Sequence, residues 1–405
     1  MHSYDGPIFD TDTHLVETLD AWVRCLPSKY REDYGIEHKV GPDGEFALYI
    51  GGTRKVEVGA GYRTQDGKVP PPGSLKEFLL ALKNGKDNVD SRVPISADQF
   101  ERAARIAKLE EFGVTDSIMY CGEHVSTLGY IKEMPVDAAH EVLHAYNRWM
   151  LEDWGFEFSS KKTRGYVAPV LHLFDLDKAV EETEWAIRSG ARAVVFPLGP
   201  VDTRAPGDPY FDPVWSRLNE AGVLVVYHIS EATHMHSLMR IWGEPPLQSR
   251  LKQSAWTYMN AYGRVPIVQT LSSLIFYNFF ERFPNIHVLS AENGAEWVPA
   301  MLIDMDKARG MAKNSPWPCG QLKDRPSRIF RKHVSVVAYP EDDLAEVVRQ
   351  AGSLEWLTMG SDYPHAEGVK TPRHFADEAC QGLSAEQVRA VMYDNGRRLI
   401  NVKGP

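Results

Sequence analysis

Short apolar segments rich in β-branched residues alternate along the chain with longer segments whose apolar residues recur every three or four positions. The first pattern predicts buried strands and the second predicts amphipathic helices. Strands are expected at 8–13, 114–120, 165–171, 191–197, 223–228, 286–291, 334–338 and 356–361. Helices are expected at 97–112, 136–154, 177–189, 211–221, 265–283 and 342–351, with a last one opening at the capping box Ser384-Ala-Glu-Gln387.

Eight strands with helices between them are the element count of an α/β fold of the (β/α)8 TIM barrel type. A doubly wound open sheet is the alternative, but no GxGxxG follows the first strand to support it. The 405 residues suit two domains by length alone, or one barrel that carries insertions. We therefore expect a single barrel domain over residues 1–405.

Two segments, about 28–96 and 232–264, interrupt the strand–helix repeat. The first is rich in Gly, Pro and charge and includes Pro70-Pro-Pro-Gly73; the second is rich in Trp and Tyr. Both leave from the C-terminal ends of predicted strands, the first and the fifth, where a barrel builds its active site. We expect them to form a cap over the substrate, and a surface insertion without catalytic importance is the alternative.

Composition narrows the class of protein. Hydrophobic residues make up 43% and charged residues 25%, as in ordinary globular proteins, and the net charge is −10. The sequence has no block of Lys and Arg of the kind that binds nucleic acid, so we expect no nucleic-acid partner. The four cysteines lie far apart without a CxxC pair, which argues against a thiolate zinc site and a disulfide framework. No apolar run has transmembrane length, so we expect a cytoplasmic enzyme with no membrane partner; whether it is a homo-oligomer stays open.

Carboxylates and imidazoles gather at the ends of the predicted strands. The first strand carries Asp10, Asp12 and His14 on one face, since residues two apart on a strand share a face, and Glu17 follows. His228 and Glu231 end the fifth strand, Glu292 follows the sixth, and Asp362 and His365 follow the eighth. Because a barrel brings these ends together, they predict one metal site with an open position for substrate. Hydrogen-bonded polar residues at strand termini are the alternative.

These motifs resemble those of the metal-dependent amidohydrolase family 2. The residues that carry the resemblance are Asp12-x-His14, His228, Glu292-Asn-Gly-x-x-Trp297 and Ser361-Asp-Tyr-Pro-His365. Two shorter motifs also match, Tyr146-Asn-x-Trp149 and Asn395-Gly-Arg-Arg-Leu399. The resemblance implies a (β/α)8 hydrolase or non-oxidative decarboxylase. It also implies that Asp12, His14, His228 and Asp362 bind the metal.

Three departures from the family pattern change this expectation. The first strand carries Asp-x-His where the family often has His-x-His or Glu-x-His, and Glu292 stands where a catalytic histidine is often found. The end of the fourth strand, Phe196-Pro-Leu-Gly199, has no lysine. A two-metal hydrolytic site bridged by a carboxylated lysine is therefore not available.

What remains is a carboxylate-rich ligand set, which moves metal preference from zinc towards iron or manganese. Its five carboxylates and two histidines approach the four carboxylates and two histidines that bind the metals of di-iron proteins. The pairs His14-x-x-Glu17 and His228-x-x-Glu231 make the chain similar to a branch of non-heme di-iron monooxygenases, one of which hydroxylates a diterpenoid precursor in antibiotic biosynthesis. That resemblance implies two iron ions, dioxygen, an electron donor and an apolar, CoA-linked acid as substrate. Its metal ligands would be Asp12, His14, Glu17, His228, Glu231, Glu292 and Asp362, with Glu292 and His365 as catalytic residues.

The alternative is one Zn or Mn ion in a hydrolase or non-oxidative decarboxylase. The oxygenase hypothesis predicts two metals per chain, with Glu17 and Glu292 touching them, whereas the alternative leaves Glu17 and Glu231 unligated. Glu17 and Glu231 could each have a structural role instead of binding metal. Glu17, for example, could stand at the start of a helix, where the helix dipole favours an acid. Whether His234, His236 or Glu296 ligates metal stays open, and His365 could instead orient Asp362.

Overall fold

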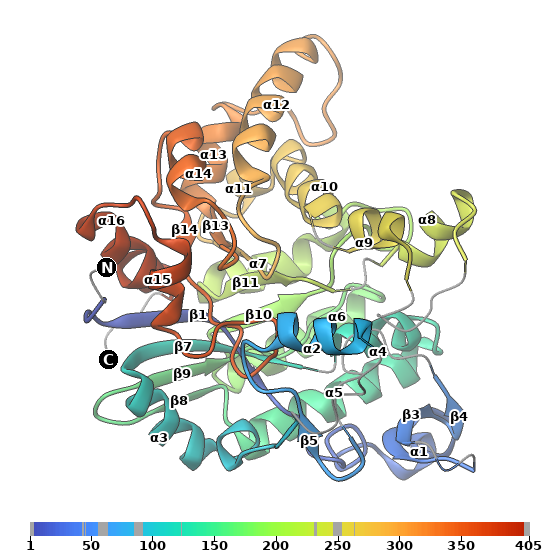
Figure 1. Ribbon diagram of the computed structural model, residues 1–405. Coiled ribbons are helices and arrows are strands. Elements are labelled where there is room, and N and C mark those ends of the chain that lie inside the picture. The colour runs from blue at the N-terminus through green and yellow to red at the C-terminus, as the bar shows by residue number, and fades with distance from the viewer. Residues whose placement is uncertain are drawn as a thin grey trace.

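The computed structural model describes residues 4–42, 44, 46–55, 64–84, 92–122, 124–230, 233–245, 253–262 and 264–400. Among these residues, eight strands that pair in parallel form the central structure (Figure 1). They are β1 (Ile8–Leu15), β7 (Val114–Cys121), β9 (Arg164–Val167), β10 (Ala193–Phe196), β11 (Leu224–His228), β12 (Val288–Ala291), β13 (Val334–Val337) and β14 (Leu357–Thr358). Each lies within or overlaps one of the expected strands, so the predicted strand set is confirmed.

The strands close into a ring through two short seams. One sheet runs β1-β7-β9, with β8 (Glu157–Ser159) antiparallel at its edge, and the other runs β10 to β14. Val170 pairs in parallel with Val195 and joins β9 to β10, while Thr13 pairs in parallel with Tyr363 and joins β1 to the segment after β14. The amide of His14 also donates to the carbonyl oxygen of Tyr363 at 2.7 Å. The predicted TIM barrel is therefore confirmed over the predicted open sheet.

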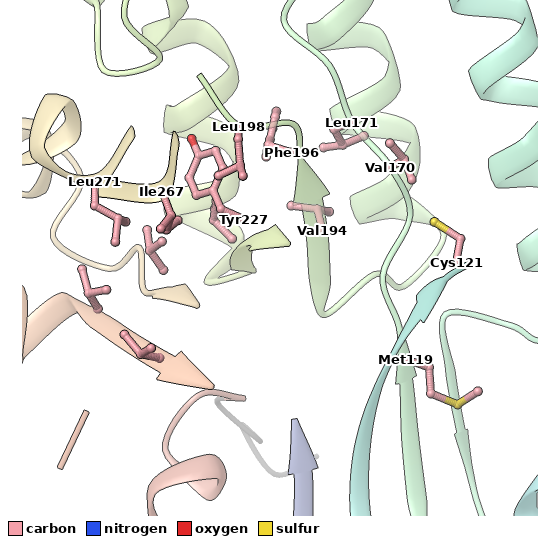
Figure 2. Packing of buried hydrophobic residues seen from close by; sticks show 14 of the residues in the cluster. Met119, Cys121, Val170, Leu171, Val194, Phe196, Leu198, Tyr227, Ile267 and Leu271 are labelled. Atoms are coloured by element: carbon pink, nitrogen blue, oxygen red, sulfur yellow. The ribbon is translucent and has the colours of Figure 1, made fainter. Parts of the chain in front are cut away.

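Alternation along the strands divides the core into an inner and an outer layer. On β10, Ala193 and Val195 belong to a cluster inside the ring, whereas Val194 and Phe196 pack in the large outer cluster. Figure 2 shows outward side chains of this kind, including Tyr227 of β11, facing Ile267 and Leu271. Because every strand is covered on its outer face by helices, the strand sequences are nearly continuous apolar runs.

Helices surround the ring (Figure 1). Those at expected positions are α3 (Arg102–Phe112), α5 (Val136–Asp153), α6 (Leu176–Arg188), α7 (Asp212–Ala221), α10 (Arg264–Phe276), α11 (Phe279–Arg282) and α14 (Leu344–Ala351). The capping box at Ser384 and Gln387 is present at the start of α16 (Ala385–Arg389). The other barrel helices are α4 (His124–Lys132), α12 (Val298–Met311), α13 (Pro326–His333), α15 (His374–Ala379) and α17 (Asn395–Arg397), with a π-helical turn at Ala390–Asp394.

The first insertion forms small elements outside the ring. Its described parts are α1 (Ser28–Tyr34), the antiparallel strands β2 (Ile36–Val40), β3 (Phe46–Ile50) and β4 (Thr53–Arg54), the pair β5 (Lys68–Val69) and β6 (Val93–Pro94), and α2 (Leu75–Lys83). The amides of Gly73 and Leu75 donate to the carbonyl oxygens of His365 and Ala366 at 3.3 and 2.9 Å. This insertion therefore contacts the loop that carries His365, as expected for a cap. The described parts of the second insertion hold α8 (Met235–Ile241) and α9 (Ala255–Ala261).

Candidate metal centre

Strand alternation and one irregularity aim the first ligands into the barrel mouth. On β11, Leu224 and Val226 belong to the inner cluster, so His228, two residues further, continues the same inward face. On β1, Phe9 is inward, and a register shift between Asp10 and Thr13 follows. Such a bulge re-aims the side chains beyond it. It lets Asp12 join the inward cluster.

Glu292 and Asp362 reach the same place through unusual backbone. Both follow the ends of strands and both have positive φ, 51° and 55°. Few residues other than glycine adopt this conformation, and it is concentrated at functional sites. Alternation alone would carry Glu292 outward, because Leu289 and Ala291 are the inward residues of β12. The left-handed turn instead brings its carboxylate to the mouth.

The side chains converge on one another. Nε2 of His14 lies 3.3 Å from Oδ1 of Asp12 and 3.3 Å from Oδ1 of Asp362. Nε2 of His228 lies 3.5 Å from the same Asp12 oxygen and 3.4 Å from Oε2 of Glu292. Nδ1 of His365 lies 2.8 Å from Oδ1 of Asp362, and its ring stacks on that of His14 at 4.0 Å between centroids. The predicted residues of four separate strands therefore meet in one cluster.

Backbone contacts set the orientation of the two imidazoles. Nδ1 of His14 lies 3.3 Å from the carbonyl oxygen of Cys121, and Nδ1 of His228 lies 2.9 Å from that of Ile229. A proton on each Nδ1 satisfies these carbonyls, so that in the neutral ring, the form that binds a metal ion, the lone pair of each Nε2 is directed at the cluster. This is the tautomer that metal-ligating histidines adopt, since the backbone fixes the ring from its far side.

Charge is balanced within the cluster. Burial opposes ionisation of Asp12, but the imidazoles of His14 and His228 hold the pKa of Asp12 below its usual value. Burial likewise opposes ionisation of Asp362, yet the charge of His365 and contact with His14 lower the pKa of Asp362. The same carboxylates overcome burial at the imidazoles and raise the pKa of His228 to about 9 and that of His365 to about 10.

Glu292 behaves oppositely to the aspartates. Burial, followed by the negative charge of Asp362, raises the pKa of Glu292 well above its usual value. Three carboxylates that approach one another cannot all ionise cheaply, so the last of them holds its proton. Burial and the neighbouring carboxylates therefore favour the protonated form of Glu292 more than that of Asp12 or Asp362.

The donor set fits a divalent metal ion. Oδ1 of Asp12 and Nε2 of His14 are buried and have no hydrogen-bond partner among the described residues, a condition that is rare for buried polar atoms unless an ion satisfies them. Ligand atoms lie within 4.8 Å of one another in three groups: Asp12–His14–His228, His14–Asp362–His365 and Glu292–Asp362–Glu367. A cation here would take the place of the imidazole protons, because it binds neutral imidazole and ionised carboxylate.

Glu17 lies beside the cluster, where its carboxylate contacts Gly122 and Tyr146. Its carboxylate is buried and accepts hydrogen bonds from the Gly122 amide at 2.9 Å and from the Tyr146 hydroxyl. Tyr146 in turn stacks on Trp22, with ring centroids 3.8 Å apart. Glu17 is in none of the three metal-capable groups found among the described residues. Metal ligation by Glu17 stays a prediction, and Glu231 lies outside the described residues.

The remaining candidates are His234, His236 and Glu296. His234 precedes α8 and is half-buried, and Nδ1 of the more exposed His236 lies 3.8 Å from Oε1 of Glu133. Glu296 is exposed. Among the described residues, none of these three belongs to a metal-capable group.

Glu367 is the group member that the sequence analysis missed. It lies five residues beyond Asp362, after the strand end, where no periodic pattern extends. The one weak signal in the sequence was the glycine that follows, Gly368. In the structure a Cβ at this position would lie 2.2 Å from the carbonyl oxygen of Ser361. Only glycine lets the loop fold back on the strand end, and that return brings Glu367 towards Asp362.

A closed ring of parallel strands with carboxylates and imidazoles at its C-terminal mouth defines a metal-dependent (β/α)8 enzyme. A family model described as Amidohydrolase (Amidohydro_2) matches residues 125–402, more than half of the chain. The chain therefore belongs to this amidohydrolase family. No curated protein matches the chain in a sequence comparison.

Solved structures agree on the fold. An amidohydrolase from Mycobacterium avium subsp. paratuberculosis K-10 is similar at 27% identity and a TM-score of 0.81, covering 98% of this chain and 100% of its own. 5-Carboxyvanillate decarboxylase from Sphingomonas paucimobilis has 15% identity and a TM-score of 0.60, with 97% and 98% coverage. A dihydroxybenzoic acid decarboxylase from Polaromonas sp. JS666, solved with manganese and an inhibitor, has 12% identity and a TM-score of 0.59, with 98% coverage of both chains.

The sequence has no apolar run of transmembrane length, and the structure agrees on this point. No helix in the described part of the chain combines the length and the apolar character needed to cross a membrane.

Proposed function

We propose that this protein is a metal-dependent non-oxidative decarboxylase of a small organic acid, using one manganese or zinc ion. Asp12, His14, His228 and Asp362 would hold the ion. The observation that carries the proposal is Glu292, a mostly buried carboxyl with a raised pKa that lies 3.4 Å from the ligand His228. Decarboxylation breaks a carbon–carbon bond, leaves the electron pair on the substrate, and needs a proton delivered to that carbon.

The residues divide the work between them. When bound, a divalent ion would draw electron density from a substrate oxygen and so stabilise the charge left behind. Glu292 lies next to the ligands, its pKa is raised by burial and by Asp362, and it would deliver the proton as a general acid. His365 holds Oδ1 of Asp362 at 2.8 Å and fixes the direction of that ligand. Hydrolysis is less favoured because its base must begin without a proton.

The test is turnover in heavy water. The protein is stripped with a chelator, reloaded with Mn²⁺ or Zn²⁺, and incubated in D2O with aromatic acids, beginning with 5-carboxyvanillate and 2,6-dihydroxybenzoate. The expected result is release of CO2 and one deuterium on the product carbon that carried the carboxyl. Glu292→Gln should bind the metal normally and lose turnover. Cleavage of esters or amides without CO2 release would replace decarboxylation by hydrolysis.

A di-iron monooxygenase is the second candidate, and one observation favours it. Glu292, Asp362 and Glu367 form a carboxylate group that adjoins Asp12, His14 and His228, which gives room for two neighbouring ions without a lysine carbamate. This hypothesis keeps the two iron ions, dioxygen, an electron donor and the apolar, CoA-linked acid expected from the narrower resemblance. The position of Glu17 at Tyr146, outside the ligand groups, weighs against it.

Metal counting separates the two candidates. Anaerobic loading with Fe²⁺ followed by elemental analysis should give about two irons per chain for the oxygenase and one for the decarboxylase. Glu367→Gln offers the sharper comparison, because it should remove only the second ion. Oxygen uptake by the loaded wild type, lost in Glu367→Gln, would favour the oxygenase. One ion in both proteins, with no oxygen uptake, would leave decarboxylation.

A further inference from the structure

A fully buried arginine lies directly behind the metal ligands of β1. Arg105, on α3, has no exposed surface. Its Nη2 donates to the carbonyl oxygen of His14 at 2.7 Å, and its Nε donates to the carbonyl oxygen of Asp98 at 2.6 Å. Its guanidinium also lies over the ring of Tyr363, 5.3 Å from the ring centroid. Arg105 thus contacts the backbone of one ligand and the immediate chain neighbour of another, Asp362.

The same contacts extend to the point where the first insertion rejoins the barrel. Asp98 belongs to a short helical turn, Ala97–Gln99, and its Oδ2 accepts a hydrogen bond from the Tyr363 hydroxyl at 2.7 Å. The amide of Val16 donates to the carbonyl oxygen of Gln99 at 2.8 Å. Arg105 therefore sits at the centre of a buried network that joins the end of β1, the segment after β14 and the returning insertion.

Stability alone explains this arginine poorly. Among the described residues it makes no ion pair within 4 Å, and its Nη1 has no hydrogen-bond partner. Burying a cation with incomplete compensation is costly, and this cost offsets part of what its two hydrogen bonds contribute to stability. What an apolar side chain cannot do is hold two carbonyl oxygens at fixed positions, which the planar fork of arginine does.

We propose that Arg105 is a positioning residue for the metal site. By binding the His14 carbonyl oxygen and packing on Tyr363, it fixes β1 and the segment after β14 in the register at which Nε2 of His14 and Oδ1 of Asp362 lie 3.3 Å apart. The role resembles that of outer contacts which orient metal ligands, whose loss commonly weakens metal binding by about 10–100-fold. The inference rests on the metal site of the proposed function, and not on the reaction performed there.

The test compares metal affinity in variants of the full chain. Mn²⁺ binding is measured from the electron paramagnetic resonance signal of free Mn²⁺, and the Co²⁺ absorption spectrum reports ligand geometry. Arg105→Met should raise the Mn²⁺ dissociation constant tenfold or more and change the Co²⁺ bands. Arg105→Lys keeps the charge but not the fork, and should raise it less. Leu109→Ala is the matched control, because Leu109 is buried one turn further along α3 and its apolar side chain has no polar atom with which to hold the His14 carbonyl oxygen.

The outcomes decide the inference without reference to turnover. Arg105→Met and Leu109→Ala should both lower the melting temperature, but only the arginine variants should weaken Mn²⁺ binding. Wild-type affinity in Arg105→Met, or an equal loss in Leu109→Ala, overturns the positioning role. If Arg105→Met does not fold, an unchanged dissociation constant in Arg105→Lys overturns it instead. A wild type that binds no Mn²⁺ overturns both proposals, whereas one that binds Mn²⁺ without decarboxylating overturns only the reaction.

Discussion

Loss of the Asn147 side chain should strongly destabilise the barrel. This side chain, on α5, is fully buried and clamps the seam between β9 and β10. Nδ2 donates to the carbonyl oxygen of Val170 at 2.8 Å, and Oδ1 accepts from the Val170 amide at 2.9 Å. Nδ2 also donates to Oε1 of buried Glu182 at 2.8 Å. At this seam Val170 and Val195 form only an isolated bridge, so Asn147 takes the place of a strand partner.

The expected magnitude follows from these three bonds. Asn147→Ala leaves the amide and carbonyl of Val170 and one oxygen of Glu182 without their partner in a place that excludes water. Each buried polar group left unsatisfied costs about 1–3 kcal/mol, although water entering the new space would recover part of that. A loss of about 3–6 kcal/mol in the free energy of unfolding results. Since folded proteins are stable by about 5–15 kcal/mol, this single substitution should remove much of the total.

The assay is urea unfolding, followed both by tryptophan fluorescence and by far-ultraviolet circular dichroism. Coincident transitions would justify comparing midpoints. The control is Gln350→Ala, which loses one exposed hydrogen bond, to Glu346, and should cost less than about 0.5 kcal/mol. If Asn147→Ala falls within about 1 kcal/mol of wild type, the seam does not depend on this clamp and the reasoning is refuted.

Three further predictions concern the site and pH. Asp12→Asn should abolish tight metal binding, because Oδ1 of Asp12 faces both His14 and His228; metal analysis after gel filtration tests this, and retention of one ion would contradict it. Glu292→Gln should lower kcat by about 100–10,000-fold at full metal content, and unchanged kcat would remove Glu292 from the reaction. Burial lowers the pKa of His172 from 6.5 to about 4. The unfolded chain therefore binds this proton more readily, and stability present above pH 6.5 should fall by up to about 3 kcal/mol as the pH drops towards 4. His172→Gln should remove that part of the pH dependence of the urea midpoint, and an identical pH curve would show that His172 is not responsible.

The ring of strands and the meeting of Asp12, His14, His228 and Asp362 were predictable from the sequence. Strand periodicity is local, and the barrel geometry then dictates that strand ends converge. The helix Val298–Met311 was missed, because its apolar residues do not fall on one clear face and pattern reasoning needs a contrast between faces.

The contacts of Glu17 and Glu367 could not be predicted for a different reason. Both follow strand ends, where position depends on which distant group the chain meets. Glu17 meets Tyr146, 129 residues away, and no spacing in the sequence encodes that encounter. The spacing His14-x-x-Glu17 suggested a shared metal, and the structure places the two side chains at the adjacent residues Cys121 and Gly122; metal binding by Glu17 stays a prediction.

The ring closure between β1 and the segment after β14 has a consequence for how the protein is made. The amide of Asp362 donates to the carbonyl oxygen of Asp12 at 2.8 Å, so two proposed ligands of one ion are brought together across almost the whole chain. On the ribosome, residues near Asp12 emerge long before Asp362 is synthesised. Closing so long a loop costs entropy that only the completed barrel repays. The complete set of four proposed ligands therefore forms only after the last strand has been synthesised.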